Sequence, residues 1–100
     1  MPMINVSAQE LQIIKSILSE KCPNTPVWVF GSRVKGTHKP FSDIDLALLT
    51  TTPLTIRELT QLELAFSDSD LPFKVDIVDW ASCSESFKQI ILQKYEVLIP

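Results

Sequence analysis

Hydrophobic residues recur at intervals of three and four in three stretches of the chain, the spacing of a helix with one buried face. Each stretch follows a serine or threonine with a glutamate three residues later, the capping-box pattern of a helix start. The three boxes pair Ser7 with Glu10, Thr55 with Glu58 and Ser82 with Glu85. The sequence therefore predicts one helix ending at Lys21, a second ending near Ser67, and a third that contains Phe87, Ile90 and Ile91.

Strand patterns lie between these helices. Residues 27–30 are β-branched and aromatic, and residues 74–80 alternate with period two. Residues 43–49 alternate at their start and are apolar at their end, as in a strand buried on both faces. The apolar tail, residues 97–99, predicts an edge strand. Strands that alternate with helices predict an α/β fold, with a small mixed β-sheet and helices packed against it.

Length and composition narrow the class of protein. One hundred residues with 45% hydrophobic content predict a single domain over residues 1–100. No apolar run approaches the ~20 residues of a membrane span, and residues 1–5 lack a secretory pattern, so we expect a cytoplasmic protein without membrane contact. The net charge of −3 disfavours direct nucleic-acid binding. Cys22 and Cys83 fit no zinc or redox motif and are predicted to be buried or half-buried thiols.

Candidate chemistry concentrates between residues 31 and 45. Gly31 ends a predicted strand and permits a tight turn, and Ser32 begins a short helical turn whose free amides favour a phosphate. Asp43 and Asp45 are two residues apart on a strand, so both side chains leave the same face with Cα atoms roughly 6.5–7 Å apart. Their apolar neighbours are expected to point into the core. Positive charge beside the turn comes from Arg33, Lys35, His38 and Lys39.

A third carboxylate, Asp76, lies inside an apolar strand, where burial of an unpaired charge is costly. It could join Asp43 and Asp45, or form a structural ion pair with Lys74 or Arg33. Three aspartates beside a phosphate-binding turn are typical of a site for two Mg²⁺ ions, ~3.5–4 Å apart, that promotes attack on phosphorus. Mg²⁺ prefers oxygen ligands, so no histidine or cysteine ligand is expected.

Gly31-Ser32, ten further residues and then Asp43-x-Asp45 resemble the signature of polymerase-beta-type nucleotidyltransferases. In so short a chain they resemble the minimal nucleotidyltransferase (MNT) antitoxins. The resemblance implies the minimal nucleotidyltransferase fold, with Ser32 and nearby amides on the β and γ phosphates of a nucleoside triphosphate. Asp43 and Asp45 would bind both metals, and Asp76 would bind the catalytic metal and help activate the hydroxyl. Gly31, Arg33 and Lys35 complete the expected nucleotide-binding set.

MNT antitoxins are encoded beside a helical HEPN ribonuclease toxin and transfer AMP from ATP to a toxin tyrosine. The resemblance therefore implies ATP as substrate, a HEPN toxin as partner and a hetero-oligomer. One alternative is an antitoxin that neutralises its toxin by binding alone. The other is a nucleotidyltransferase for a small molecule such as an aminoglycoside, although those enzymes usually carry an extra helical domain for which this chain has no residues.

Overall fold

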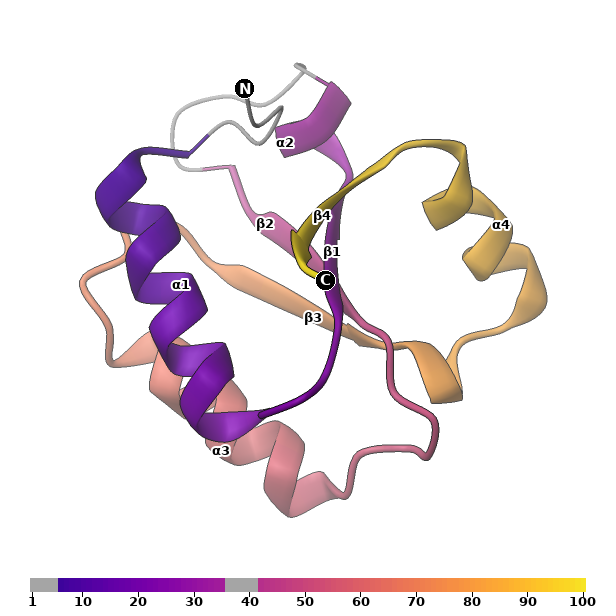
Figure 1. Ribbon diagram of the computed structural model, residues 1–100, viewed down its shortest axis with the longest axis horizontal. Helices are drawn as coiled ribbons and strands as arrows, with labels where there is room; N and C mark the ends of the chain where they lie inside the picture. The colour runs from indigo at the N-terminus through magenta and orange to yellow at the C-terminus, as the bar shows by residue number, and fades with distance from the viewer. Residues whose placement is uncertain (1–5, 36–41) are drawn as a thin grey trace.

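The computed structural model describes residues 6–35 and 42–100, without the side chains of Ser32 and Lys35, as a four-stranded sheet with helices on both faces (Figure 1). In chain order the elements are α1 (Ala8–Lys21), β1 (Val27–Phe30), α2 (Ser32–Lys35), β2 (Ile44–Leu48), α3 (Ile56–Ser67), β3 (Val75–Asp79), the 3₁₀ turn η1 (Trp80–Ser82), α4 (Glu85–Gln93) and β4 (Tyr95–Ile99). Every helix among the described residues is too short or too polar to span a bilayer.

The sheet is mixed, as predicted, with strand order β3-β2-β1-β4. Strand β1 runs antiparallel to β2 and to β4, whereas β2 and β3 are parallel. The end of β1 therefore meets the starts of β2 and β3 at the same edge of the sheet. In this register Phe30 pairs with Asp45, and Asp45 pairs with Asp76.

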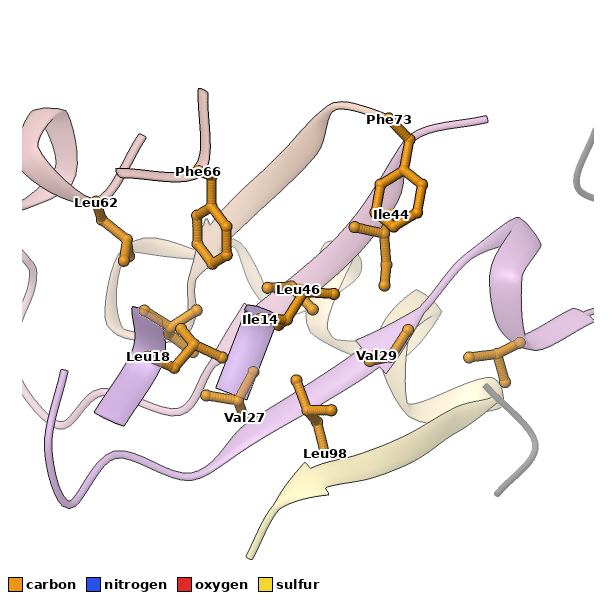
Figure 2. Close-up of a cluster of buried hydrophobic side chains, with 12 residues drawn as sticks. Ile14, Leu18, Val27, Val29, Ile44, Leu46, Leu62, Phe66, Phe73 and Leu98 are labelled. Carbon is orange, nitrogen blue, oxygen red and sulfur yellow. The ribbon is translucent and has the colours of Figure 1, made fainter. Parts of the chain in front are cut away.

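Helices α1 and α3 cover one face of the sheet and bury the larger core (Figures 1 and 2). Alternate residues of the two central strands point into it, which confirms the predicted periodicity. Burial of one such side chain contributes roughly 1.5–3 kcal/mol. The fully buried members are Ile14, Leu18, Val27, Val29, Ile44, Leu46, Leu48 and Leu62.

Helix α4 covers the opposite face, where a smaller core forms around Phe30, Ala47 and Ile91. Aromatic rings complete this core: Trp28 stacks on Tyr95 with ring centroids 3.9 Å apart, and its edge meets Trp80. The strand residues that face α4 alternate with those that face α1 and α3. Asp45 and Asp76 occupy such alternate positions, so their side chains share the α4 face.

Most predicted element boundaries are confirmed, and the exceptions have local causes. The predicted cap Ser82 is wrong: Ser82 lies in η1, and Ser84 caps α4 by accepting a hydrogen bond from the Phe87 amide. Strand β2 starts at Ile44, one residue after Asp43, and β3 ends at Asp79, where η1 begins. The tail forms edge strand β4, as predicted. Both cysteines are half-buried free thiols, also as predicted.

Asp79 joins the ends of the two parallel strands. Its carboxylate accepts hydrogen bonds from the Thr50 hydroxyl, from the Leu54 amide at 2.8 Å and from the Ser82 hydroxyl at 3.0 Å. Partial burial by itself would raise the pKa of Asp79, but these hydrogen bonds to the charged form outweigh it and hold the pKa below its usual value.

Replacing Asp79 by Asn is expected to lower the free energy of unfolding at pH 7 by about 2 kcal/mol, because hydrogen bonds to a charged acceptor are lost. Because folding lowers the pKa of Asp79, its ionised carboxylate stabilises the fold at pH values above the unfolded-state pKa of about 3.9. This stabilisation is lost as the pH falls through the folded-state pKa of Asp79. Urea unfolding at pH 7 and in steps below pH 4 measures the difference between the two proteins. A difference that stays constant down to low pH contradicts this role.

Candidate active site

Strand alternation places Asp45 and Asp76 on the face opposite the larger core. Ile44 and Leu46, which flank Asp45, are fully buried against α1 and α3, as the sequence predicts. The neighbours of Asp76, Val75 and Ile77, pack against the same core. The parallel register then sets the two aspartates side by side on adjacent strands. Two carboxylates from distant parts of the sequence thus meet at one edge of the sheet.

Asp43 brings a third carboxylate from the residue just before β2, where it is exposed. Burial first, then hydrogen bonding with the Asp43 side chain and the charge of Asp43, raise the pKa of Asp76. Two carboxyl groups share a hydrogen bond only when one of them carries a proton, which explains this direction. Lys74 acts in the opposite sense, with its Nζ 3.7 Å from Asp76 Oδ1. Asp76 thus contacts both Asp43, a member of the predicted carboxylate cluster, and Lys74, a predicted ion-pair partner.

The surroundings of Asp45 disfavour its ionised form. Burial, the charge of Asp76 and the charge of Asp43, in that order, raise the pKa of Asp45 to about 6. Each of these causes disfavours the ionised form. A proton or a cation bound at Asp45 offsets all three of these unfavourable effects, so the site is suited to hold positive charge.

The donor set fits Mg²⁺, which binds one or two carboxylates together with phosphate and water oxygens. No group of three acidic, histidine or cysteine side chains in the described residues is close enough to enclose a metal ion by itself. Substrate phosphates and water would have to supply the remaining oxygen ligands.

Gly31 ends β1 in a conformation that a side chain would disturb. Its φ of +80° lies in the left-handed region. A Cβ at this position would overlap Oδ2 of Asp45 and lie 3.1 Å from its Cγ. Gly31 therefore lets the backbone lie directly against the central carboxylate, a reason for glycine beyond the predicted tight turn.

The predicted helical turn after Gly31 is present as α2, with the Val34 amide donating to the Gly31 carbonyl at 3.1 Å. The side chains of Ser32 and Lys35, and all of His38 and Lys39, lie outside the described part of the structure. The phosphate contacts predicted for Ser32 and Lys35 stay predictions.

Arg33, by contrast, belongs to the described part of the structure and is buried, with 6% of its surface exposed. Its Nη2 donates to the Ser42 carbonyl at 2.7 Å, and its guanidinium lies 4.5 Å from the centre of the Phe73 ring. The sequence predicts contact with a triphosphate for this residue and does not indicate these partners. No sequence pattern links residues 33, 42 and 73, because only the sheet brings them together.

A cavity of about 430 Å³ lies beside the cluster, between the end of α3 and the start of β3. Its lining comprises Glu63, Phe66, Ser67, Leu71, Phe73, Lys74 and Val75. Lys74 belongs both to this cavity and to the ion pair with Asp76, but none of the three carboxylates lines the cavity. The carboxylates thus lie at an open sheet edge next to the cavity.

Residues 12–100 match the family model described as polymerase beta, nucleotidyltransferase. The chain belongs to this nucleotidyltransferase family. It is 46% identical over 95 residues to a probable protein adenylyltransferase, MntA, of Haemophilus influenzae, a match that covers 95% of this nucleotidyltransferase and 83% of the relative.

Two solved structures extend the comparison. One is a toxin-antitoxin complex with AMP-PNP, matched with a TM-score of 0.76 and 29% identity over 88% of this nucleotidyltransferase and 71% of that chain. The other is the tri-AMPylated Shewanella oneidensis HEPN toxin in complex with MNT antitoxin, with a TM-score of 0.69 and 26% identity over 90% and 69% of the two chains. The minimal nucleotidyltransferase fold expected from the sequence is confirmed.

Proposed function

We propose that this nucleotidyltransferase transfers AMP from ATP to a hydroxyl group, a tyrosine side chain, of a HEPN-type toxin, and thereby acts as its antitoxin. The observation that carries the proposal is the alignment of three carboxylates beside Gly31 at one sheet edge. The 46% identical relative is a probable protein adenylyltransferase, and a similar solved antitoxin is bound to an AMPylated toxin. Because the proposed reaction consumes ATP, we propose a cytoplasmic location.

Each site residue has a proposed role. Asp43, Asp45 and Asp76 would hold two Mg²⁺ ions, which when bound neutralise the phosphates and polarise the P–O bonds. Gly31 and the α2 amides, with Ser32 and Lys35, would hold the β and γ phosphates. The tyrosine oxygen attacks the α-phosphorus, an O–P bond forms, the bond to the β-phosphate oxygen breaks and pyrophosphate leaves. Asp76 would orient the hydroxyl and accept its proton.

The open position of the carboxylates favours a protein acceptor. The cavity beside them does not enclose them, and Asp43 is exposed. A toxin bound over this edge would exclude water and present its tyrosine, as transfer to a hydroxyl rather than to water requires. Catalysis therefore depends on a hetero-oligomer.

Co-expression with the adjacent toxin gene, followed by intact-mass spectrometry of the toxin after incubation with ATP and Mg²⁺, tests the proposal. A gain of one or more AMP units is the expected result. A toxin that binds tightly but gains no mass would replace this function by neutralisation through binding alone. Transfer to an aminoglycoside with no transfer to the toxin would favour a small-molecule enzyme.

Added Mg²⁺ is expected to stabilise the protein at pH 7.5 because it relieves repulsion among the carboxylates. At ten times the dissociation constant the gain is about 1.4 kcal/mol, which corresponds to a rise in Tm of several degrees for a domain of this size. Thermal unfolding in 10 mM Mg²⁺ and in EDTA measures it. The Asp45→Asn variant should show a much smaller rise, and an equal rise in both proteins places the Mg²⁺ elsewhere.

A further inference from the structure

We propose that Arg33 is a positioning residue that holds together the three backbone segments from which the carboxylate cluster is built. The inference rests on the proposed nucleotidyl transfer and gives Arg33 a role different from the phosphate contact that its place in the sequence predicts.

The guanidinium of Arg33 is held by groups of the protein. It is 6% exposed, it donates from Nη2 to the Ser42 carbonyl at 2.7 Å, and it lies 4.5 Å from the centroid of the Phe73 ring. Phe73 is itself 9% exposed and belongs to the larger core. An arginine held in this way is part of the scaffold, because movement toward a ligand would leave a buried cation without its partners.

The two contacts connect the segments that carry the site. Arg33 is the second residue of α2, directly after the turn at Gly31. Ser42 immediately precedes Asp43, and Phe73 lies three residues before Asp76. The Ile44 amide donates to the Lys74 carbonyl at 3.0 Å and joins the starts of β2 and β3 at the same place. Figure 2 shows Phe73 and Ile44 at one end of the core cluster.

Such a connection is needed because the carboxylates oppose their own assembly. Asp45 and Asp76 are paired on adjacent strands, and repulsion between their negative charges would by itself drive the segments apart. A neutral hydrogen-bond acceptor and an aromatic ring anchor Arg33 without adding to this negative charge. These two contacts therefore hold the backbone before Asp43 and before Asp76 through uncharged groups.

Lysine would not replace arginine here. A planar guanidinium lies flat on a ring and directs its N–H groups at fixed angles, whereas an ammonium on a flexible stem does neither. A phosphate contact, in contrast, depends mainly on charge and tolerates lysine. The response to Arg33→Lys thus separates the two roles.

The test measures Mg²⁺ binding calorimetrically in the full-length chain, without nucleotide, for Arg33→Lys, Arg33→Met and Phe73→Leu. Arg57→Met, at the exposed second arginine of the chain, is the matched control. We expect Mg²⁺ affinity to fall about tenfold or more in all three variants, as for residues that orient metal ligands, and to stay unchanged in the control. In transfer assays over a range of ATP concentrations, kcat should fall with little change in the KM for ATP.

Coupling gives a second readout. If Arg33 acts through Phe73, the double variant Arg33→Lys with Phe73→Leu should bind Mg²⁺ about as weakly as either single variant. Urea unfolding of every variant verifies that it is folded at the assay temperature, and if Arg33→Met is not folded, Arg33→Lys and Phe73→Leu carry the test.

Two results would overturn the inference. The first is a Mg²⁺ affinity that is unchanged in folded Arg33→Lys and Phe73→Leu, together with a KM for ATP that is raised in Arg33→Met and normal in Arg33→Lys. This is the behaviour of a phosphate ligand. The other is a wild-type chain that binds no Mg²⁺ even with ATP, which removes the site itself. A wild-type chain that binds Mg²⁺ but transfers no AMP contradicts the proposed function. In that case the Mg²⁺ titrations of the variants still decide whether Arg33 is a positioning residue.

Discussion

Asp45→Asn is expected to reduce AMP transfer to the toxin by about 10³-fold or more, which corresponds to roughly 4 kcal/mol of lost transition-state stabilisation. The amide has nearly the same shape as the carboxylate but carries no charge. Asp45 pairs with Asp76 across the parallel strands and contacts Gly31, so it lies at the centre of the cluster. Removal of its charge therefore weakens the cation site at its most constrained position.

The same substitution should leave the folded state as stable as the wild type at pH 7, or more stable. The folded protein raises the pKa of Asp45 to about 6, so ionised Asp45 disfavours folding at pH 7, and this penalty disappears in the amide. Intact-mass kinetics and urea unfolding of the same preparation measure both effects. Asp70→Asn, in the exposed turn before β3, is the control and should change neither. Near-normal transfer by Asp45→Asn would exclude the proposed role of this carboxylate.

Gly31→Ala is expected to lower the free energy of unfolding by about 3 kcal/mol and to reduce transfer at least ~10²-fold. The positive φ costs an alanine roughly 1–2 kcal/mol, and overlap with Asp45 adds a comparable amount. Displacement of Asp45 by the new methyl group accounts for the loss of rate, because a shift of about 1 Å in a catalytic site has effects of this size.

A double-mutant cycle separates the two causes. Asp45→Ala removes the Oδ2 and Cγ atoms that the new Cβ would meet and leaves Asp45 Cβ at an ordinary contact distance of 3.5 Å. In the Asp45→Ala background, Gly31→Ala should therefore cost only about 1–2 kcal/mol, the part due to φ. Urea unfolding of the four proteins gives the coupling energy. Equal costs in both backgrounds would mean that Gly31 serves the turn alone.

Local sequence patterns determined much of the fold. The capping boxes at Ser7 and Thr55 fixed two helix starts, because cap hydrogen bonds involve residues only three positions apart. The third pattern misled, because Ser82 lies in η1 and Ser84, which the pattern did not indicate, caps α4. The two-residue alternation around Asp45 and Asp76 fixed the face of each carboxylate, because a strand turns successive side chains to opposite faces.

The tertiary structure decided what depends on residues far apart in the chain. The pairing of Asp45 with Asp76 follows from a parallel register, and the closeness of Gly31 to Asp45 follows from the antiparallel pairing of β1 and β2. Arg33 has the sequence context of a phosphate ligand, yet in the folded chain its guanidinium contacts the Ser42 carbonyl and the Phe73 ring. Residue type and spacing determine which chemistry this chain can perform, whereas packing determines which charges meet, because burial and distance set the cost of each charge.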